Sequence, residues 1–187
     1  MGTIIQINWF LWEKDCMKSL KLFSIISAFL IASCGGTAEN IKEGMSAPNF
    51  ILSGAYGNSF SLASFKEKSP VIIYFYPKAS TPGCTKQACG VRDNISKFKE
   101  NGIAIFGISV DTKSKIKDFI DSYGLNFPLL SDENKEVSKS YGVLNALGFD
   151  SRVTFIIDKN GDINKIIRDV DVDKHAEQVY EIALNLK

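Results

Sequence analysis

Residues 71–89 read VIIYFYPKASTPGCTKQAC. The first six are apolar, β-branched or aromatic without interruption, as expected of a strand buried on both faces of a sheet. A polar loop follows, and Thr81-Pro82 then suits a helix N-cap and first helical position. The stretch therefore predicts a buried strand, a short loop and a helix that begins near Pro82.

Similar patterns recur along the chain. A turn at residues 54–58 predicts an N-terminal β-hairpin within residues 49–62. Apolar runs predict further strands at 103–110 and 153–158, followed by a strand through Ile163, Ile166 and Ile167. Helical spacing predicts helices at 82–101, 114–123, 133–141 and 173–186. This order predicts an α/β fold with a mixed central β-sheet flanked by helices.

Composition excludes several classes of protein. The 187 residues include 45% hydrophobic and 23% charged residues, which is ordinary for a globular domain. Twenty-two Lys+Arg against 21 Asp+Glu give a net charge of +1 without a basic block, so we expect no nucleic-acid partner. A mean hydropathy of +0.00 is too low for a bundle of membrane spans.

The N-terminal region has the pattern of a targeting signal. Residues 17–34 read MKSLKLFSIISAFLIASC, with two lysines, an apolar run at 22–32 and small residues after it. An uncleaved membrane anchor is the alternative interpretation. The ending at residues 31–34 resembles the lipobox of bacterial lipoproteins. The resemblance implies cleavage before Cys34, a lipid on its sulfur, and a membrane-anchored lipoprotein of the bacterial cell envelope, in the inner or outer membrane.

These patterns divide the chain into four parts. We expect residues 1–16 to reflect a misassigned start, with Met17 as the initiator, and 17–33 to be the signal peptide. Residues 34–44 are then a lipidated linker and 45–187 the folded domain. Cys84 and Cys89 remain as the two thiols of the exported protein.

Cys84 falls in the first turn of the predicted helix. Unpaired backbone N–H groups and the helix dipole favour negative charge there, so the thiol is expected to ionise readily and act as a nucleophile. A buried cysteine that merely packs is the alternative. Cys84, Cys89 and the single histidine, His175, are too few ligands for a metal site, so we expect no metal and no cofactor. His175 is predicted on the surface.

The segment PKASTPGCTKQAC resembles the active-site loop of peroxiredoxins, in which Pro77, Thr81 and Cys84 match the pattern position for position. A second cysteine at position 89 is similar to the peroxiredoxin Q or bacterioferritin co-migratory protein subfamily. The resemblance covers roughly residues 44–187. It implies a thioredoxin fold and thiol-dependent reduction of hydrogen peroxide and organic hydroperoxides.

The resemblance also implies a role for each site residue. Cys84 is the peroxidatic cysteine, which attacks the peroxide and becomes a sulfenic acid. Thr81 orients peroxide and thiolate, Arg152 stabilises the developing charge, and Pro77 limits access of water. Cys89 is the resolving cysteine. A thioredoxin-like reductant and a monomeric enzyme are expected.

Two other functions remain open at this point: an envelope thiol–disulfide oxidoreductase or redox relay, and a non-catalytic thioredoxin-fold scaffold. The first lacks the expected Cys-x-x-Cys motif. Helix geometry adds a mechanistic expectation for the peroxidase. Cα atoms five residues apart in a helix lie about 8 Å apart, whereas a disulfide needs roughly 4.4–6.8 Å. The start of the helix must therefore unwind before Cys84 and Cys89 can join.

Overall fold

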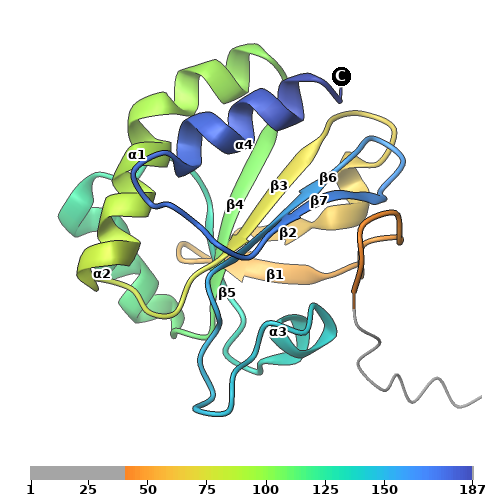
Figure 1. Ribbon diagram of the computed structural model, residues 1–187. Helices are drawn as coiled ribbons and strands as arrows, with labels where there is room; N and C mark the ends of the chain where they lie inside the picture. Colours follow the sequence, from red (N-terminus) through yellow and green to blue (C-terminus); the bar gives the residue numbers. More distant parts are fainter. Residues whose placement is uncertain (1–40, 187) are drawn as a thin grey trace, which may run out of the picture. The chain divides into compact units, whose positions relative to one another are not determined.

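The computed structural model describes residues 41–186, which form one seven-stranded mixed sheet in the order β2-β1-β5-β4-β3-β6-β7 (Figure 1). The strands are β1 (Ile51–Gly54), β2 (Ser59–Ser61), β3 (Val71–Phe75), β4 (Ala104–Ser109), β5 (Leu129–Ser131), β6 (Val153–Ile157) and β7 (Ile163–Ile167). The helices are the 3-10 helix η1 (Leu62–Phe65), α1 (Pro82–Glu100), α2 (Lys113–Tyr123), α3 (Glu136–Ser140) and α4 (His175–Leu184). The predicted mixed α/β fold with an N-terminal hairpin is confirmed.

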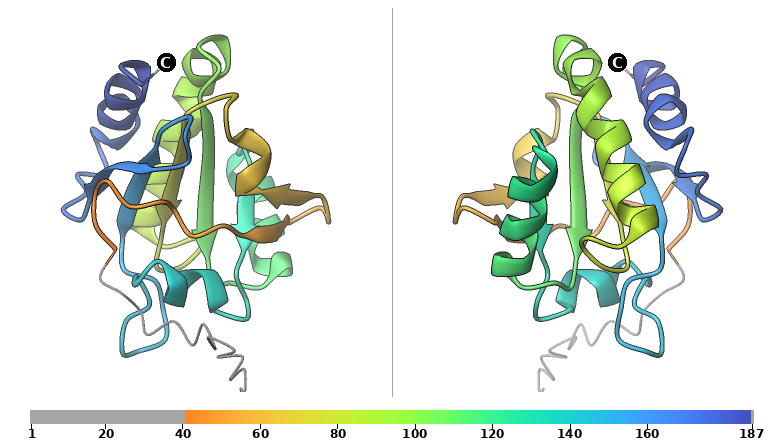
Figure 2. Two further views of the ribbon diagram at one scale, coloured as in Figure 1. Left: turned by 90° about the vertical axis from the view of Figure 1, so that its right-hand side faces the viewer. Right: turned by 90° about the vertical axis from the view of Figure 1, so that its left-hand side faces the viewer.

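The buried strand predicted from residue 71 onward, β3, is the centre of the sheet. It pairs parallel with β4 and antiparallel with β6, and all five of its residues are buried. Alternate side chains supply the two cores. Ile72, Tyr74 and Tyr76 belong to the core beneath α1, α2 and α4, whereas Val71, Ile73 and Phe75 belong to the core that contains residues of η1 and α3. Figure 2 shows these helices on the two sides of the sheet.

The predicted boundaries agree with the structure within a few residues for β3, β4, β6, α1, α2 and α4. The differences concern short elements. The three-residue strand β5 was not predicted, because so short a run carries no periodicity. Helix α3 is five residues long rather than the nine expected at 133–141.

The described chain begins along the edge strand β7. The backbone N–H of Gly44 donates to the carbonyl of Ile163 at 2.7 Å, and Ile41 is buried. Residues 41–44, predicted as the end of a linker, therefore already pack on the domain. The predicted parts 1–16 and 17–33, and Cys34, lie outside the described residues. Between residues 41 and 186 no helix is both long and apolar enough to cross a membrane.

Candidate active site

The loop after β3 and the first turn of α1 place Cys84 against the sheet. Thr81 is the N-cap with an extended backbone, Pro82 is the first helical residue, and Cys84 is the third. The Cys84 side chain is only 2% exposed. The loop is fixed from the neighbouring strand end, because the Ala79 N–H donates to Asp111 Oδ2 at 2.7 Å. The predicted strand–loop–helix arrangement around Cys84 is confirmed.

Arg152 reaches this cysteine from the start of β6. Its Nη2 donates to the Cys84 sulfur at 3.4 Å, and its Nη1 donates to Oε1 of Gln87, one turn further along α1. The pairing of β6 with β3 brings Arg152 here, since Val153 lies opposite Phe75. A positive guanidinium thus faces a sulfur at a helix N-terminus, where negative charge that develops during a reaction is stabilised.

Thr81 and Pro77 flank the site. Thr81 is half-buried, and its hydroxyl donates to the carbonyl of Lys78 at 3.0 Å. Its side chain makes no capping bond to the helix, so the hydroxyl does not serve as the helix cap. Because its single proton is used on Lys78, the Thr81 oxygen keeps lone pairs that can accept from a bound molecule. Pro77 is half-buried in the loop that leads from β3.

His175 was predicted on the surface, and this is wrong: the side chain is 0% exposed. Nε2 of its ring lies 2.8 Å from the Thr154 hydroxyl, and Nδ1 lies 3.2 Å from Nε2 of Gln87. Burial first, and then the charge of Arg152, lower the pKa of His175 to about 4. Gln87 is also fully buried and was missed, because a lone glutamine in an amphipathic helix carries no distinguishing signal.

The second cysteine lies in the same helix. Cys89 is half-buried on α1, five residues after Cys84, and within the described residues both thiols are free. The helix is continuous from Pro82 to Glu100, so the two Cα atoms are separated by about 8 Å. This exceeds the range of a disulfide, roughly 4.4–6.8 Å. The reduced fold therefore keeps the two thiols apart.

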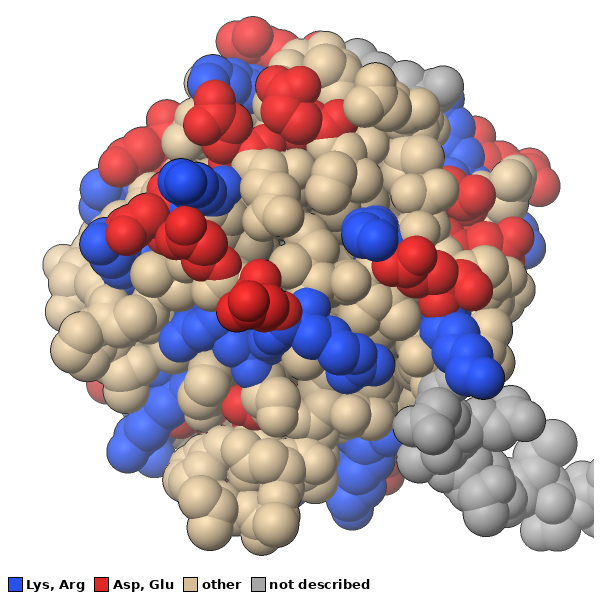
Figure 3. Space-filling view, in the orientation of Figure 1, with Lys and Arg blue, Asp and Glu red and all other residues tan. Residues whose placement is uncertain are grey.

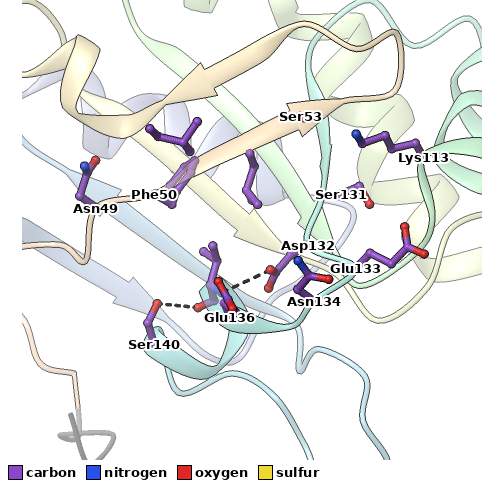
Figure 4. Close-up of a pocket in the computed structure, with 13 residues that line it drawn as sticks. Asn49, Phe50, Ser53, Lys113, Ser131, Asp132, Glu133, Asn134, Glu136 and Ser140 are labelled. Atoms are coloured by element: carbon purple, nitrogen blue, oxygen red, sulfur yellow. Dashed lines mark hydrogen bonds between the residues drawn. The ribbon is translucent and has the colours of Figure 1, made fainter. Parts of the chain in front are cut away.

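A pocket of about 690 Å³ lies elsewhere, between β1 and α3 (Figure 4). Its lining includes Asn49, Lys113, Glu133 and Glu136, and neither Cys84 nor Arg152 belongs to it. The described residues contain no group of three His, Cys, Asp or Glu side chains that could hold a metal ion. In the face shown in Figure 3, acidic and basic side chains are interspersed.

Comparison with known proteins identifies the class of protein to which this fold and site belong. Residues 44–166 match the AhpC/TSA family, and the chain belongs to that family. It is 42% identical over 149 residues to a chloroplastic peroxiredoxin Q of Oryza sativa subsp. japonica (78% of this chain, 68% of the relative). It is 39% identical over 146 residues to peroxiredoxin Bcp of Escherichia coli K12 (74% and 93%).

Solved structures agree. The fold matches peroxidoxin BcpB from Mycobacterium tuberculosis with a TM-score of 0.72 and 32% identity, over 79% of this chain and 99% of that one. The chain is therefore a peroxiredoxin of the Q/Bcp subfamily with a thioredoxin-like fold. Its activity is that of a thiol-dependent peroxidase, which confirms the predicted enzyme class over the relay and the scaffold.

The predicted location, a membrane-anchored lipoprotein of the bacterial cell envelope, is wrong. Relatives at 40–42% identity are named as chloroplastic proteins, and the Escherichia coli relative is named simply as a peroxiredoxin. The error has a physical origin. Basic residues followed by a short apolar run indicate a targeting segment but carry little information about its destination.

Proposed function

We propose that Cys84 is the peroxidatic cysteine and that Arg152 activates it. The observation that carries this proposal is the contact of 3.4 Å between Arg152 Nη2 and the Cys84 sulfur in the first turn of α1. The thiolate attacks one peroxide oxygen, an S–O bond forms and the O–O bond breaks. The departing oxygen takes up a proton and leaves as water or an alcohol, and Cys84 becomes a sulfenic acid. The Arg152 guanidinium stabilises the charge on that oxygen.

We assign supporting roles to Thr81 and Pro77. The Thr81 hydroxyl donates to Lys78, so its oxygen can accept from the O–H of a peroxide and align the O–O bond with the sulfur. Pro77 offers no backbone N–H and limits access of water to the sulfenic acid. These roles concern substrate position, so Thr81→Val should lower the rate with peroxide while leaving the fold intact.

Cys89 is the proposed resolving cysteine. Its thiol attacks the Cys84 sulfenic acid, an S–S bond forms and water leaves. Because α1 holds the thiols apart, its first turns must open in each cycle. Amide hydrogen exchange between Pro82 and Val91 should therefore be faster in the oxidised than in the reduced protein. Equally slow exchange in both states would contradict the opening.

A thioredoxin-type dithiol would then reduce the disulfide, and we propose hydrogen peroxide and organic hydroperoxides as substrates. One solved relative, a Xanthomonas campestris bacterioferritin comigratory protein at 28% identity, is described by its alkyl peroxide reduction activity. We also expect a monomer, which sedimentation of the reduced protein will test.

The test of the two cysteine roles is a stoichiometric oxidation. The fully reduced protein receives one equivalent of hydrogen peroxide, and alkylation with peptide mass spectrometry follows each thiol over seconds. Rapid loss of both thiols, absent in Cys84→Ser, is expected. In Cys89→Ser, Cys84 should stop at the sulfenic acid. Loss of the Cys84 thiol alone in the unchanged protein would assign resolution to an outside thiol.

We propose further that the catalytic unit is residues 45–187, that the targeting segment 17–33 is absent from the mature protein, and that Met17 is the initiator. The described residues, 41–186, all belong to one compact unit, which supports placing the catalytic unit in this part of the chain. The mass of the mature N-terminal peptide tests the cleavage, and a peptide from residues 1–16 would contradict the start at Met17.

A further inference from the structure

We propose that His175 is a positioning residue for peroxide reduction: its neutral imidazole orients the Gln87 amide, which holds the Arg152 guanidinium against the Cys84 sulfur. The inference rests on the roles proposed for Cys84 and Arg152. It adds a residue from the C-terminal helix α4 that acts on Arg152 through Gln87.

Four elements meet at the His175 ring. The residue opens α4, Gln87 comes from α1, Thr154 from β6, and Tyr74 from β3 packs edge-on at 5.6 Å between ring centroids. Tyr74 and Thr154 are direct partners across the two strands. Gln87, Thr154 and His175 are each 0% exposed. Burial of three polar side chains in contact is costly unless their donors and acceptors match.

The donors and acceptors determine the direction of the whole chain of bonds. A guanidinium can only donate, so the Gln87 group facing Arg152 must be its carbonyl Oε1. The amide nitrogen of Gln87 then faces the ring, 3.2 Å from Nδ1 and 3.4 Å from Nε2. We assign Nδ1, the nearer ring nitrogen, as the acceptor of this amide, which places the proton on Nε2, 2.8 Å from the Thr154 hydroxyl.

A charged ring would break this chain. Protonated Nδ1 would set a donor against the Gln87 amide nitrogen, and a flipped amide would set its NH2 against the Arg152 donors. The charge nearest the ring favours the neutral form, because Arg152, held by Gln87, repels a second positive charge. Burial acts in the same direction and, with Arg152, lowers the pKa of His175 to about 4.

The same chain links the position of Arg152 to the state of α1. Gln87 lies between Cys84 and Cys89, within the turns that must open for the disulfide to form. Opening removes Gln87 from both the guanidinium and the imidazole. Refolding of α1 after reduction restores the bonds, so Arg152 is held in place only when the Cys84 thiol is again in the folded helix.

The first test uses the fact that His175 is the only histidine in the chain. Nitrogen-15 NMR of the reduced protein at pH 7 should show one neutral imidazole with its proton on Nε2. An imidazole protonated on Nδ1, or a charged ring, would overturn the proposal. This measurement involves no turnover, so it stands independently of the proposed chemistry.

The second test compares variants in the rate constant of Cys84 with hydrogen peroxide. His175→Leu keeps bulk and removes the acceptor, and we expect a 10- to 100-fold slower reaction. His175→Asn returns an acceptor near the Nδ1 position and should recover most of that loss. Thr154→Val should lower the rate about 3- to 10-fold. Thr85→Val is the matched control, since that buried hydroxyl has no hydrogen-bond partner among the described residues and its removal should leave the rate unchanged.

Cys84 alkylation by iodoacetamide across pH supplies a readout that a purely structural role would not move. In His175→Leu the reaction should be slower and its profile altered, because the displaced guanidinium no longer contacts the sulfur. An unchanged pH profile and an unchanged rate in folded His175→Leu would overturn the proposal. If that variant does not fold, an unchanged profile and rate in Thr154→Val would overturn it instead. If Cys84→Ser still reduces peroxide, the proposed function fails instead, and the NMR result still reports on the hydrogen-bond chain.

Discussion

Two clusters of buried polar side chains lie in this domain, and they satisfy their hydrogen bonds very differently. The site cluster consists of Cys84, Gln87, Arg152, Thr154 and His175, and every member has a partner. The acidic cluster consists of three further buried residues, Asp111, Asp132 and Asp150.

In the acidic cluster, two carboxylates accept hydrogen bonds from the described part of the chain and the third does not. Asp111 accepts from the backbone N–H of Ala79, and Asp132 accepts from the backbone and hydroxyl of Ser138. Both oxygens of Asp150 lack a partner among the described residues. Burial first, and also the charges of Asp132 and Asp111, raise the pKa of Asp150 to about 7.

The contrast between the clusters shows that buried polar side chains can serve catalysis or can reduce stability. A fully matched network holds a catalytic group in one geometry, so its loss should appear mainly in the rate. An unmatched carboxylate costs free energy whenever it is charged, so its loss should appear mainly in stability. Single substitutions in each cluster can test that separation.

The largest effect is expected from Arg152→Met, which keeps a long side chain and removes the donors to Cys84 and Gln87. The rate constant with hydrogen peroxide should fall about 10²- to 10³-fold, the range for loss of one charge-stabilising donor. Stopped-flow measurement of Cys84 oxidation will show it. A loss below tenfold in a folded variant would mean that the site cluster does not hold a catalytic group.

Asp150→Asn should act on stability and spare the rate. Because the folded-state pKa of Asp150 is raised, the protein loses stability as pH rises from about 4 to about 7. Above that range this contribution to the free energy of unfolding no longer changes with pH. The neutral amide removes this loss. We expect a gain of about 2 kcal/mol at pH 8, or roughly 4–8 °C in Tm, and little or none at pH 4.

The control for this prediction is Asp111→Leu, because Oδ2 of Asp111 accepts hydrogen bonds from Ala79 and Ser109 and leucine has no acceptor. This variant should be less stable at every pH, because a matched acceptor is lost. Thermal unfolding of both variants at pH 4, 6 and 8 measures the contrast. Equal pH profiles for Asp150→Asn and the unchanged protein would show that Asp150 does not carry the buried charge.

Gly83→Ala displaces Arg152 without removing it. A Cβ at Gly83 would lie 3.2 Å from Arg152 Nη2, so the guanidinium must move by a few tenths of an ångström. Alanine favours the helix by about 0.5–1 kcal/mol. We therefore expect a slightly higher Tm together with a rate about 3- to 10-fold lower. A higher Tm with an unchanged rate would show that the position of Arg152 is not critical.

The two clusters also mark the limit of prediction from the sequence. Cys84 and Arg152 were predicted together because a motif and a family resemblance identify them, and β3 was predicted because its apolar run is unbroken. Gln87, His175 and Asp150 were not predicted as buried polar residues. His175 stands in the polar stretch DVDKHAEQ, and only the docking of α4 on β3 and β6 buries it. Burial created by tertiary contacts leaves no local pattern.

The smallest effect is expected at Tyr76. Its side chain lies near both clusters, on the face of the sheet that α1, α2 and α4 cover. Its hydroxyl is buried without a partner among the described residues, and burial raises its pKa. Tyr76→Phe removes an unmatched polar atom and keeps the ring that packs on Phe119. It should leave the peroxide rate unchanged and raise stability by about 0.5–1 kcal/mol, measured by urea unfolding. A loss of rate would assign the hydroxyl to the site cluster, and a loss of stability would reveal a partner such as bound water.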